Sequence, residues 1–297
     1  MIAFEHVTKR YGERLALDDV TWRMDEGECV VVLGHSAAGK TTLLRLITHE
    51  TQPTTGVVTV GTFRSGRLTR AHRALLRRTI GVIHEDFRLL PDRTVFENVA
   101  LALHIAGQFM DADVVPRVRR ALQEVGLDAH RDLLPAELSY GERQRCAIAR
   151  AIVNRPALIL ADEPTGALEP KSANEILTLL QRIHREGAAL LVGTTRPDVA
   201  EAITGRRYRL EEGRLREETP GASAFMPPSA AAPPEPAPAT SAPFEVVSTP
   251  APSEAAPLPT PPVPSASDTA FMPPVTPPTP PREGTAPDLF DPPGGGA

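Results

Sequence analysis

The sequence predicts an α/β fold with a parallel core sheet, a small antiparallel sheet and a helical insert, followed by a proline-rich tail. Short continuous apolar runs stand at 30–33, 80–83, 158–161 and 190–192, and such runs suit strands covered on both faces. Between them, apolar residues recur every three or four positions, which indicates crossover helices. Residues 220–297 hold 24 of the 32 prolines, so the fold is expected to end before them.

The antiparallel strands are predicted by alternation of side chains. Residues 20–25 alternate apolar and polar types, as do residues 58–60, which is typical of strands with one buried face. Residues 208–215, with a glycine at 213, predict a hairpin.

The helical insert is predicted at about 88–137. One apolar stripe with spacings of three and four runs over 96–103, and a second runs over 118–125. Gly126 is placed to end the second helix.

Residues 34–41 form the pattern of a phosphate-binding loop. They read Gly-His-Ser-Ala-Ala-Gly-Lys-Thr, which is G-x-x-x-x-G-K-[ST] between an apolar strand and a helix. Backbone N–H groups can wrap a phosphate chain, Lys40 can reach the β and γ phosphates, and the Thr41 hydroxyl can ligate Mg²⁺. The residues expected to bind the nucleotide here are Gly34, His35, Ser36, Ala37, Ala38, Gly39, Lys40, Thr41 and Thr42.

A second apolar strand ends in two acids, Asp162 and Glu163. A carboxylate at the end of a buried strand is costly unless it meets a cation, and Mg²⁺ beside the phosphate loop supplies one. Asp162 and Thr41 are therefore the predicted metal ligands. Glu163 is placed to act as general base, so that Glu163 and Lys40 are the predicted catalytic residues. Taken alone, the two acids would be read as solvated groups at a strand end.

Two further segments, 138–151 and 161–168, resemble the signature and the acidic strand of the nucleotide-binding subunit of ABC transporters. The order of phosphate loop, helical insert, signature and acidic strand is specific to that family. Within it, residues 86–100 resemble the cell-division ATPases of the FtsE type. The resemblance covers residues 1–218, which are expected to form an ABC ATP-binding domain with a P-loop NTPase core, and it leaves out 219–297.

The resemblance implies a homodimer that holds two ATP molecules head to tail, each between one subunit's phosphate loop and the other subunit's signature. Ser139 and Glu142 fit a capping box, so a helix begins there and can offer the N–H groups around Ser139 and Gly141 to a γ-phosphate. Capping alone would explain the same pattern. The family also stacks adenine on an aromatic residue, which matches Tyr11.

The implied function is binding and hydrolysis of ATP at the inner face of the cell membrane, in the cytoplasm. The implied partner is an FtsX-like integral membrane subunit, and the process is cell division or cell-wall remodelling. Residues 87–91 are expected either to receive the membrane subunit at an exposed groove or to pack inward under the insert.

Five positions depart from the family pattern. Glu85, expected near Mg²⁺ or the attacking water, replaces a glutamine, Tyr140 replaces the first signature glycine, and Thr195 replaces a histidine. Ala37 replaces a glycine of the phosphate loop, and Glu169 replaces an aspartate. Two hypotheses stay open: an ATPase, slowed by these changes, and a nucleotide-dependent structural switch with little or no hydrolysis. The retained acid at position 163 favours the first.

Composition narrows the classes of partner. The net charge is −5, and residues 220–297 alone contribute −6, so the folded part is near neutral. Nucleic-acid binding needs clustered Lys and Arg, so no nucleic-acid partner is expected. No run approaches the roughly 20 apolar residues of a membrane span, and the N-terminus lacks a signal-peptide stretch. Cys29 and Cys146 lie in apolar segments and are expected to be reduced and buried.

The segment 219–297 is expected to be disordered, with polyproline II character. The string Ala-Phe-Met-Pro-Pro occurs twice in it, around Phe225 and Phe271. The repeats indicate either docking motifs for a tail-binding protein or duplication within a linker, and both alternatives stay open.

Overall fold

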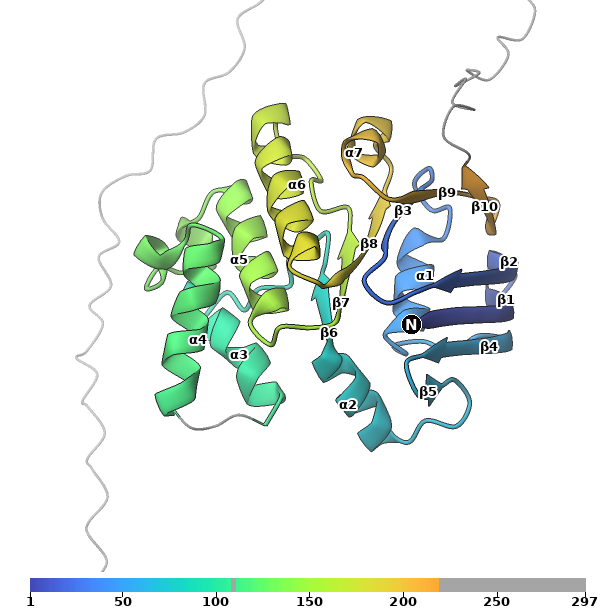
Figure 1. Cartoon of the computed structure of the whole chain (residues 1–297), viewed down its shortest axis with the longest axis horizontal. Helices are drawn as coiled ribbons and strands as arrows, with labels where there is room; N and C mark the ends of the chain where they lie inside the picture. Colours follow the sequence, from blue (N-terminus) through green and yellow to red (C-terminus); the bar gives the residue numbers. More distant parts are fainter. Residues whose placement is uncertain (108–110, 219–297) are drawn as a thin grey trace, which may run out of the picture. The chain divides into compact units, whose positions relative to one another are not determined.

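The computed structural model describes residues 1–107 and 111–218 (Figure 1). The predicted tail, with its repeats around Phe225 and Phe271, lies outside the described residues. Within the two described ranges, no helix combines the length and the hydropathy of a membrane span.

Two sheets form the framework of the molecule. The larger sheet has the strand order β10-β9-β3-β8-β7-β6, and the smaller has the order β2-β1-β4-β5. Neighbouring strands of the larger sheet are parallel except for the hairpin of β9 and β10, and the smaller sheet is antiparallel throughout. The strands are β1 (Ile2–Tyr11), β2 (Arg14–Met24), β3 (Cys29–Leu33), β4 (Thr55–Val60), β5 (Phe63–Arg64), β6 (Ile80–Ile83), β7 (Leu158–Asp162), β8 (Ala189–Thr194), β9 (Arg206–Glu211) and β10 (Arg214–Glu218).

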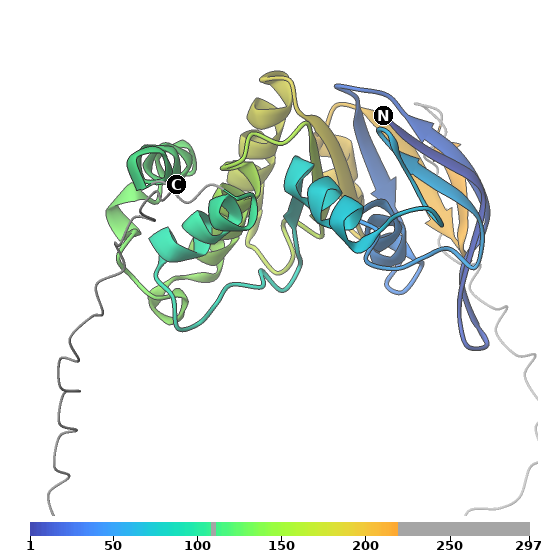
Figure 2. The same ribbon diagram turned by 90° about the horizontal axis from the view of Figure 1, so that it is seen from below.

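The helices cover the larger sheet on both faces. Helix α1 packs between the two sheets, and α5, α6 and α7 pack on the opposite face of the larger sheet, whereas α3 and α4 pack against α5 (Figures 1 and 2). The α-helices are α1 (Lys40–Ile47), α2 (Arg70–Thr79), α3 (Val95–Ile105), α4 (Asp111–Glu124), α5 (Tyr140–Ile152), α6 (Pro170–Arg185) and α7 (Pro197–Ala202), and the 3₁₀ turns are η1 (Asp128–His130) and η2 (Pro135–Glu137).

Strand β3 shows why the central runs are continuously apolar. All five of its residues are buried. Val30 and Val32 pack with α1 and the smaller sheet, while Val31 and Leu33 pack with the helices on the other face. Because both faces are covered, neither can carry polar side chains. The predicted α/β architecture, with its antiparallel sheet and helical insert, is confirmed.

The segment that leads into α3 is held by a buried amide. Asn98 of α3 accepts a hydrogen bond from the Leu90 N–H at 2.7 Å, and its Nδ2 donates to the Leu90 carbonyl at 3.1 Å and the Arg93 carbonyl at 3.0 Å. Helix α3 begins at a capping box formed by Thr94 and Glu97. The segment between β6 and α3 is therefore held in a defined conformation rather than left as a free loop.

The two cysteines are buried free thiols. Burial raises the pKa of Cys29 to about 11 and that of Cys146 to about 12, so both stay protonated near neutral pH.

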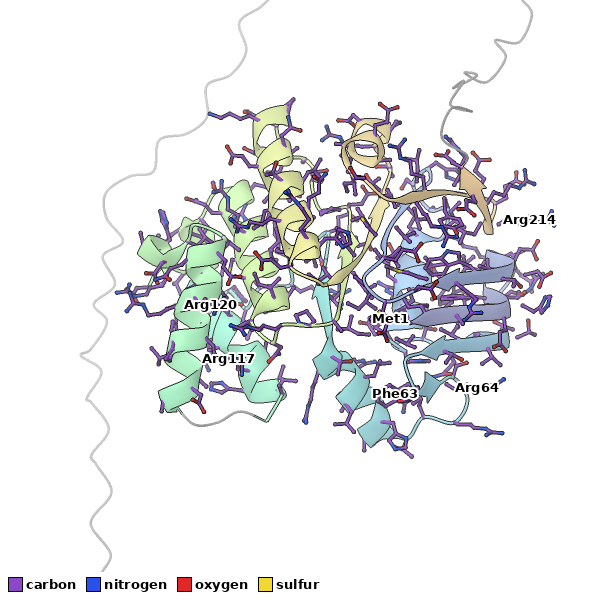
Figure 3. All side chains as sticks on the ribbon, in the orientation of Figure 1. Met1, Phe63, Arg64, Arg117, Arg120 and Arg214 are labelled. Atoms are coloured by element: carbon purple, nitrogen blue, oxygen red, sulfur yellow. The ribbon has the colours of Figure 1, made fainter. Side chains whose placement is uncertain are left out.

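Ion pairs between arginines and acids lie at the surface of the two sheets. Arg64 contacts Glu5 at 3.6 Å within the smaller sheet, and Arg214 of the larger sheet contacts Asp18 of the smaller sheet at 2.9 Å (Figure 3).

Candidate functional site

The phosphate-binding loop joins β3 to α1 at the carboxyl end of the parallel strands. Gly39 has a φ of 115°, and a Cβ at that position would lie 2.4 Å from the Ala16 carbonyl oxygen. A Cβ at Gly34 would lie 2.5 Å from the Leu210 carbonyl oxygen. Both glycines of the motif are therefore required by the close approach of neighbouring backbone. Ala37, which stands where the family has a glycine, also has a positive φ, of 66°, in the left-handed region.

Lys40 is the buried cation of this loop. Its ammonium Nζ donates to the carbonyl oxygens of Gly34 at 2.9 Å and His35 at 3.2 Å. It also lies 3.2 Å from Oε1 of Glu163. The lysine thus connects the phosphate-binding loop with the acid that follows β7.

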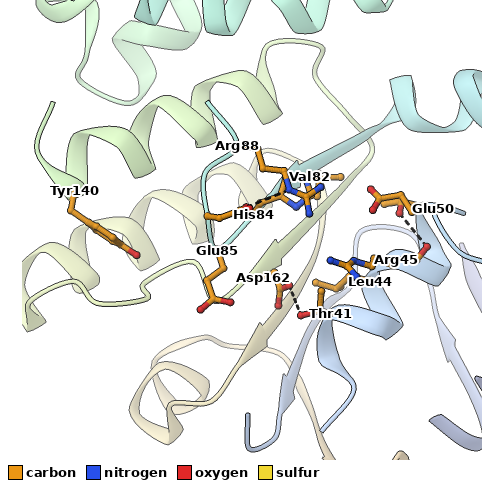
Figure 4. A pocket seen from close by; sticks show the side chains of 12 residues that line it. Thr41, Leu44, Arg45, Glu50, Val82, His84, Glu85, Arg88, Tyr140 and Asp162 are labelled. Carbon is orange, nitrogen blue, oxygen red and sulfur yellow. Dashed lines mark hydrogen bonds and ion pairs between the residues drawn. The ribbon is translucent and has the colours of Figure 1, made fainter. Parts of the chain in front are cut away.

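Asp162 and Thr41 form the second part of the site. The Thr41 hydroxyl donates to Oδ2 of Asp162 at 2.7 Å, which joins the start of α1 to the end of β7 (Figure 4). Oδ1 of Asp162 is buried and has no hydrogen-bond partner among the described residues. Burial is the main cause that raises the pKa of Asp162. A hydroxyl beside an unsatisfied carboxylate oxygen is a donor set that fits Mg²⁺ bound together with phosphate groups.

Glu163 lies at the centre of the site, in a left-handed backbone conformation with a φ of 46°. Its N–H donates to the Gly193 carbonyl at 2.8 Å. Its Oε2 accepts hydrogen bonds from the backbone N–H of Thr195 at 3.0 Å and from the Thr195 hydroxyl at 3.3 Å. One oxygen of the carboxylate therefore faces the Lys40 ammonium, and the other accepts hydrogen bonds from Thr195.

These groups share one pocket of about 290 Å³. It is formed by residues of the phosphate loop, of the loop after β6 and of the ends of β7 and β8, which lie far apart in the sequence. The lining residues are Ser36, Ala37, Lys40, Thr41, Glu85, Asp162, Glu163, Gly166 and Thr195.

A neighbouring pocket of about 430 Å³ shares Thr41, Glu85 and Asp162 with the first. In Figure 4, Glu85 lies between Asp162 and Tyr140. Glu85 therefore adds a third carboxylate, beside those of Asp162 and Glu163, to the surroundings of the predicted metal ligands. His84 also lines the larger pocket, and burial is the main cause that lowers its pKa.

The predicted binding residues of the signature, and Tyr11, lie outside both pockets. Ser139 and Gly141 stand at the start of α5, where Ser139 and Glu142 form the expected capping box. Tyr11 ends β1 with 43% of its surface exposed, and the Lys9 ammonium lies 4.7 Å from its ring centre. The structure gathers part of the phosphate loop and the acids in one pocket, whereas Ser139 and Tyr11 are exposed and Gly141 is half-buried.

The segment 87–91 is partly packed inward and partly exposed. Leu89 packs against the core under the insert, whereas Leu90 is 39% exposed. Arg150 of α5 donates to the carbonyl oxygens of Phe87 and Arg88, both at 2.5 Å. Sequence reasoning missed this arginine, since no local pattern signals a contact across more than sixty residues.

Comparisons with known proteins agree with this geometry. The family model described as "ABC transporter" matches residues 17–166. The cell division ATP-binding protein FtsE of Mycobacterium tuberculosis (strain H37Rv) is 45% identical over 226 residues, covering 74% of this chain and 97% of that protein. The protein of the same name from Escherichia coli (strain K12) is 44% identical over 216 residues, covering 72% and 97%.

A solved structure shares the fold. It is described as the dimeric structure of a post-hydrolysis state of the ATP-binding cassette MJ0796 bound to ADP and Pi. It superposes with a TM-score of 0.67 at 34% identity and covers 73% of this chain and 98% of that chain.

Proposed function

The chain belongs to the ATP-binding subunits of ABC transporters, and from that membership we propose that it hydrolyses ATP as part of an FtsX-like membrane complex. The process proposed for the complex is cell division or cell-wall remodelling, in line with the names of its relatives. The observation that carries the hydrolytic part is the position of Glu163, whose carboxylate shares one pocket with Lys40, Thr41 and Asp162.

Binding of ATP would use the phosphate loop. The Lys40 ammonium, which contacts two loop carbonyl groups, turns to the β and γ phosphates, where charge-assisted hydrogen bonds are stronger. Thr41 and Asp162 would hold Mg²⁺, which would supply positive charge beside the same phosphates. We further propose that the ATP-binding domain comprises residues 1–218, because its last strand, β10, ends at Glu218.

Hydrolysis would use Glu163 as general base. When Lys40 turns to the phosphates, it moves away from Oε1 of Glu163, which it contacts at 3.2 Å. Thr195 keeps its two hydrogen bonds to Oε2 and so holds the carboxylate in orientation. The freed Oε1 then accepts a proton from the water that attacks the γ-phosphorus atom, while the bond from that atom to the β–γ bridging oxygen breaks and ADP leaves.

The second candidate is a nucleotide-dependent switch with little or no hydrolysis. The same contact favours it, because the two hydrogen bonds from Thr195 occupy Oε2 of Glu163 and leave only Oε1 to accept a proton. The position of Glu85 favours it too, since a third negative charge beside Asp162 opposes the approach of phosphate.

We propose two partners. One is a second copy of the chain, which would bind the γ-phosphate through the N-terminus of α5 at Ser139 and Gly141; the relative with a solved structure is a dimer. The other is the membrane subunit, which would contact the exposed side chain of Leu90 and hold the chain at the inner face of the membrane.

The test is release of inorganic phosphate from ATP by the full chain in vesicles that contain the membrane subunit, with Mg²⁺ or with EDTA. The ATPase proposal expects Mg²⁺-dependent turnover that saturates with ATP. Tight ATP binding with phosphate release at the background rate would establish the switch instead. Failure to bind ATP would refute both candidates.

A further inference from the structure

We infer that Tyr140 couples the two nucleotide sites of the dimer, as a positioning residue that links the start of α5 to the loop after Glu163. The inference rests on the proposed head-to-tail dimer. In that arrangement the start of α5 serves the nucleotide of the second copy, whereas Glu163 serves the nucleotide of its own chain. A side chain that joins the two elements within one subunit therefore joins the two sites.

The first contact is between Tyr140 and Gly166. A Cβ built at Gly166 would lie 2.6 Å from the Tyr140 hydroxyl oxygen and 3.6 Å from the ring carbon Cζ. Gly166 has a φ of 35°, and its N–H donates to the Glu163 carbonyl at 3.0 Å. The hydroxyl therefore lies against the turn that follows Glu163, at a position where an added Cβ would have to displace it.

The second contact is between the rings of Tyr140 and Phe87. Their centroids are 4.7 Å apart with the planes at 72°, an edge-to-face arrangement. The Arg143 guanidinium lies 5.9 Å from the centre of the Phe87 ring, and Arg150 donates to the Phe87 carbonyl. Because Phe87 follows Glu85 by two residues, the loop after β6 is attached to α5 through the same tyrosine.

Tyr140 thus touches two of the loops that line the nucleotide pocket and itself belongs to the helix that would face the other nucleotide. Its ring turns toward Gly166 and Phe87 of its own chain, so it does not block the N–H groups at the start of α5 by folding over them. A glycine at position 140, as the family pattern has, would have no side chain to make either contact. Movement of α5 when the second copy binds ATP is expected to shift Gly166, and with it the turn that carries Glu163.

The experiment is a double-substitution cycle in the full chain carrying Glu163→Gln, which slows hydrolysis so that a dimer formed with ATP persists. Gly166→Ala places a methyl group against the Tyr140 hydroxyl, and Tyr140→Phe removes that oxygen and leaves an ordinary 3.6 Å contact. Gly61→Ala is the matched control, because Gly61 also has a positive φ, of 57°, but has no neighbour within 4 Å of an added Cβ. Sedimentation velocity over a range of Mg-ATP concentrations reports dimer formation, and ADP titration reports binding to the phosphate loop.

Coupling predicts that Gly166→Ala raises the ATP concentration for half-maximal dimerisation about tenfold and lowers the Hill slope toward 1. The ADP titration shows whether the variant also changes nucleotide binding within one chain. Adding Tyr140→Phe to Gly166→Ala restores both values, and Gly61→Ala leaves both unaltered. A failure of Tyr140→Phe to restore them, or identical titrations for all variants, would overturn the coupling and leave the dimer intact. A parent chain that binds ATP and stays monomeric would overturn the dimer itself, and the coupling with it.

Discussion

Thr195 holds the carboxylate of Glu163 through two hydrogen bonds to the same oxygen, one from its N–H at 3.0 Å and one from its hydroxyl at 3.3 Å. The residue that departs from the family's histidine therefore contacts the proposed base directly. The other carboxylate oxygen faces Lys40 at 3.2 Å. Two contacts thus orient the proposed base: the contact with Thr195, which is expected to persist, and the contact with Lys40, which nucleotide binding is expected to break.

Thr195→Val is expected to lower turnover by about three- to tenfold and to leave KM unchanged. The variant keeps the backbone N–H and loses only the hydroxyl, whose hydrogen bond to Glu163 is worth about 1 kcal/mol. Steady-state phosphate release measures this. If Thr195 serves only packing, Thr195→Val will match the wild type.

Thr195→His tests the altered position in the other direction. A histidine ring can reach the γ-phosphate and the attacking water, which a threonine reaches only through a bridging water, so turnover is expected to rise. The same phosphate-release assay applies. Unchanged turnover would indicate that Glu85 or Arg196 has taken over this role, or that the chain does not use it.

Lys40→Ala is expected to weaken Mg-ATP binding by about 2–3 kcal/mol, because the charged hydrogen bonds to the β and γ phosphates are lost. Equilibrium titration with a fluorescent ATP analogue measures the change. Lys171→Ala, which removes an exposed lysine at the start of α6, is the matched control and should bind normally. Unaltered affinity of Lys40→Ala would mean that the phosphate loop has been misassigned.

Leu90→Asp is expected to abolish co-purification with the membrane subunit while ATP binding persists, because Leu90 is 39% exposed. Leu89→Asp is the control for folding, since Leu89 packs against the core and its substitution should lower the melting temperature. Co-purification of Leu90→Asp at the wild-type level would place the membrane contact elsewhere.

His49 is expected to make stability fall as the pH is lowered. It is buried at 2% exposure, and burial, with Arg73 and Arg77 nearby, lowers its pKa from 6.5 to about 4. The unfolded chain therefore binds a proton below pH 6.5 that the folded chain does not accept until about pH 4. The contribution of His49 to the free energy of unfolding is fully present above pH 6.5. It decreases by about 2 kcal/mol between pH 7 and pH 5.

His49→Asn removes this titration and suits the left-handed backbone at that position, where φ is 50°. Urea unfolding of both proteins at pH 7 and pH 5 gives the comparison. A loss of stability equally large in His49→Asn would assign the pH dependence to other groups.

The features that could be predicted from the sequence are those set by residues close together in the chain. The phosphate loop, the acids at the end of β7 and the capping box at Ser139 each depend on neighbours within a few residues, and all were placed correctly along the chain. The contact of Tyr140 with Gly166 was not predicted, because a glycine gives no sign of which distant side chain occupies its free space. The left-handed conformation of Glu163 was also missed, since glutamate rarely adopts it and only the surrounding loop imposes it.

The central claim is that Glu163 is the general base of an ATPase, and comparison of the wild type with Glu163→Gln tests it most directly. Both are measured for ATP affinity and for steady-state phosphate release in vesicles with the membrane subunit. The account predicts equal ATP affinity, turnover lowered by about 10²- to 10⁴-fold in Glu163→Gln, and a stable dimer in the presence of ATP. Equal turnover of the two proteins, or wild-type turnover at the background rate, would contradict it.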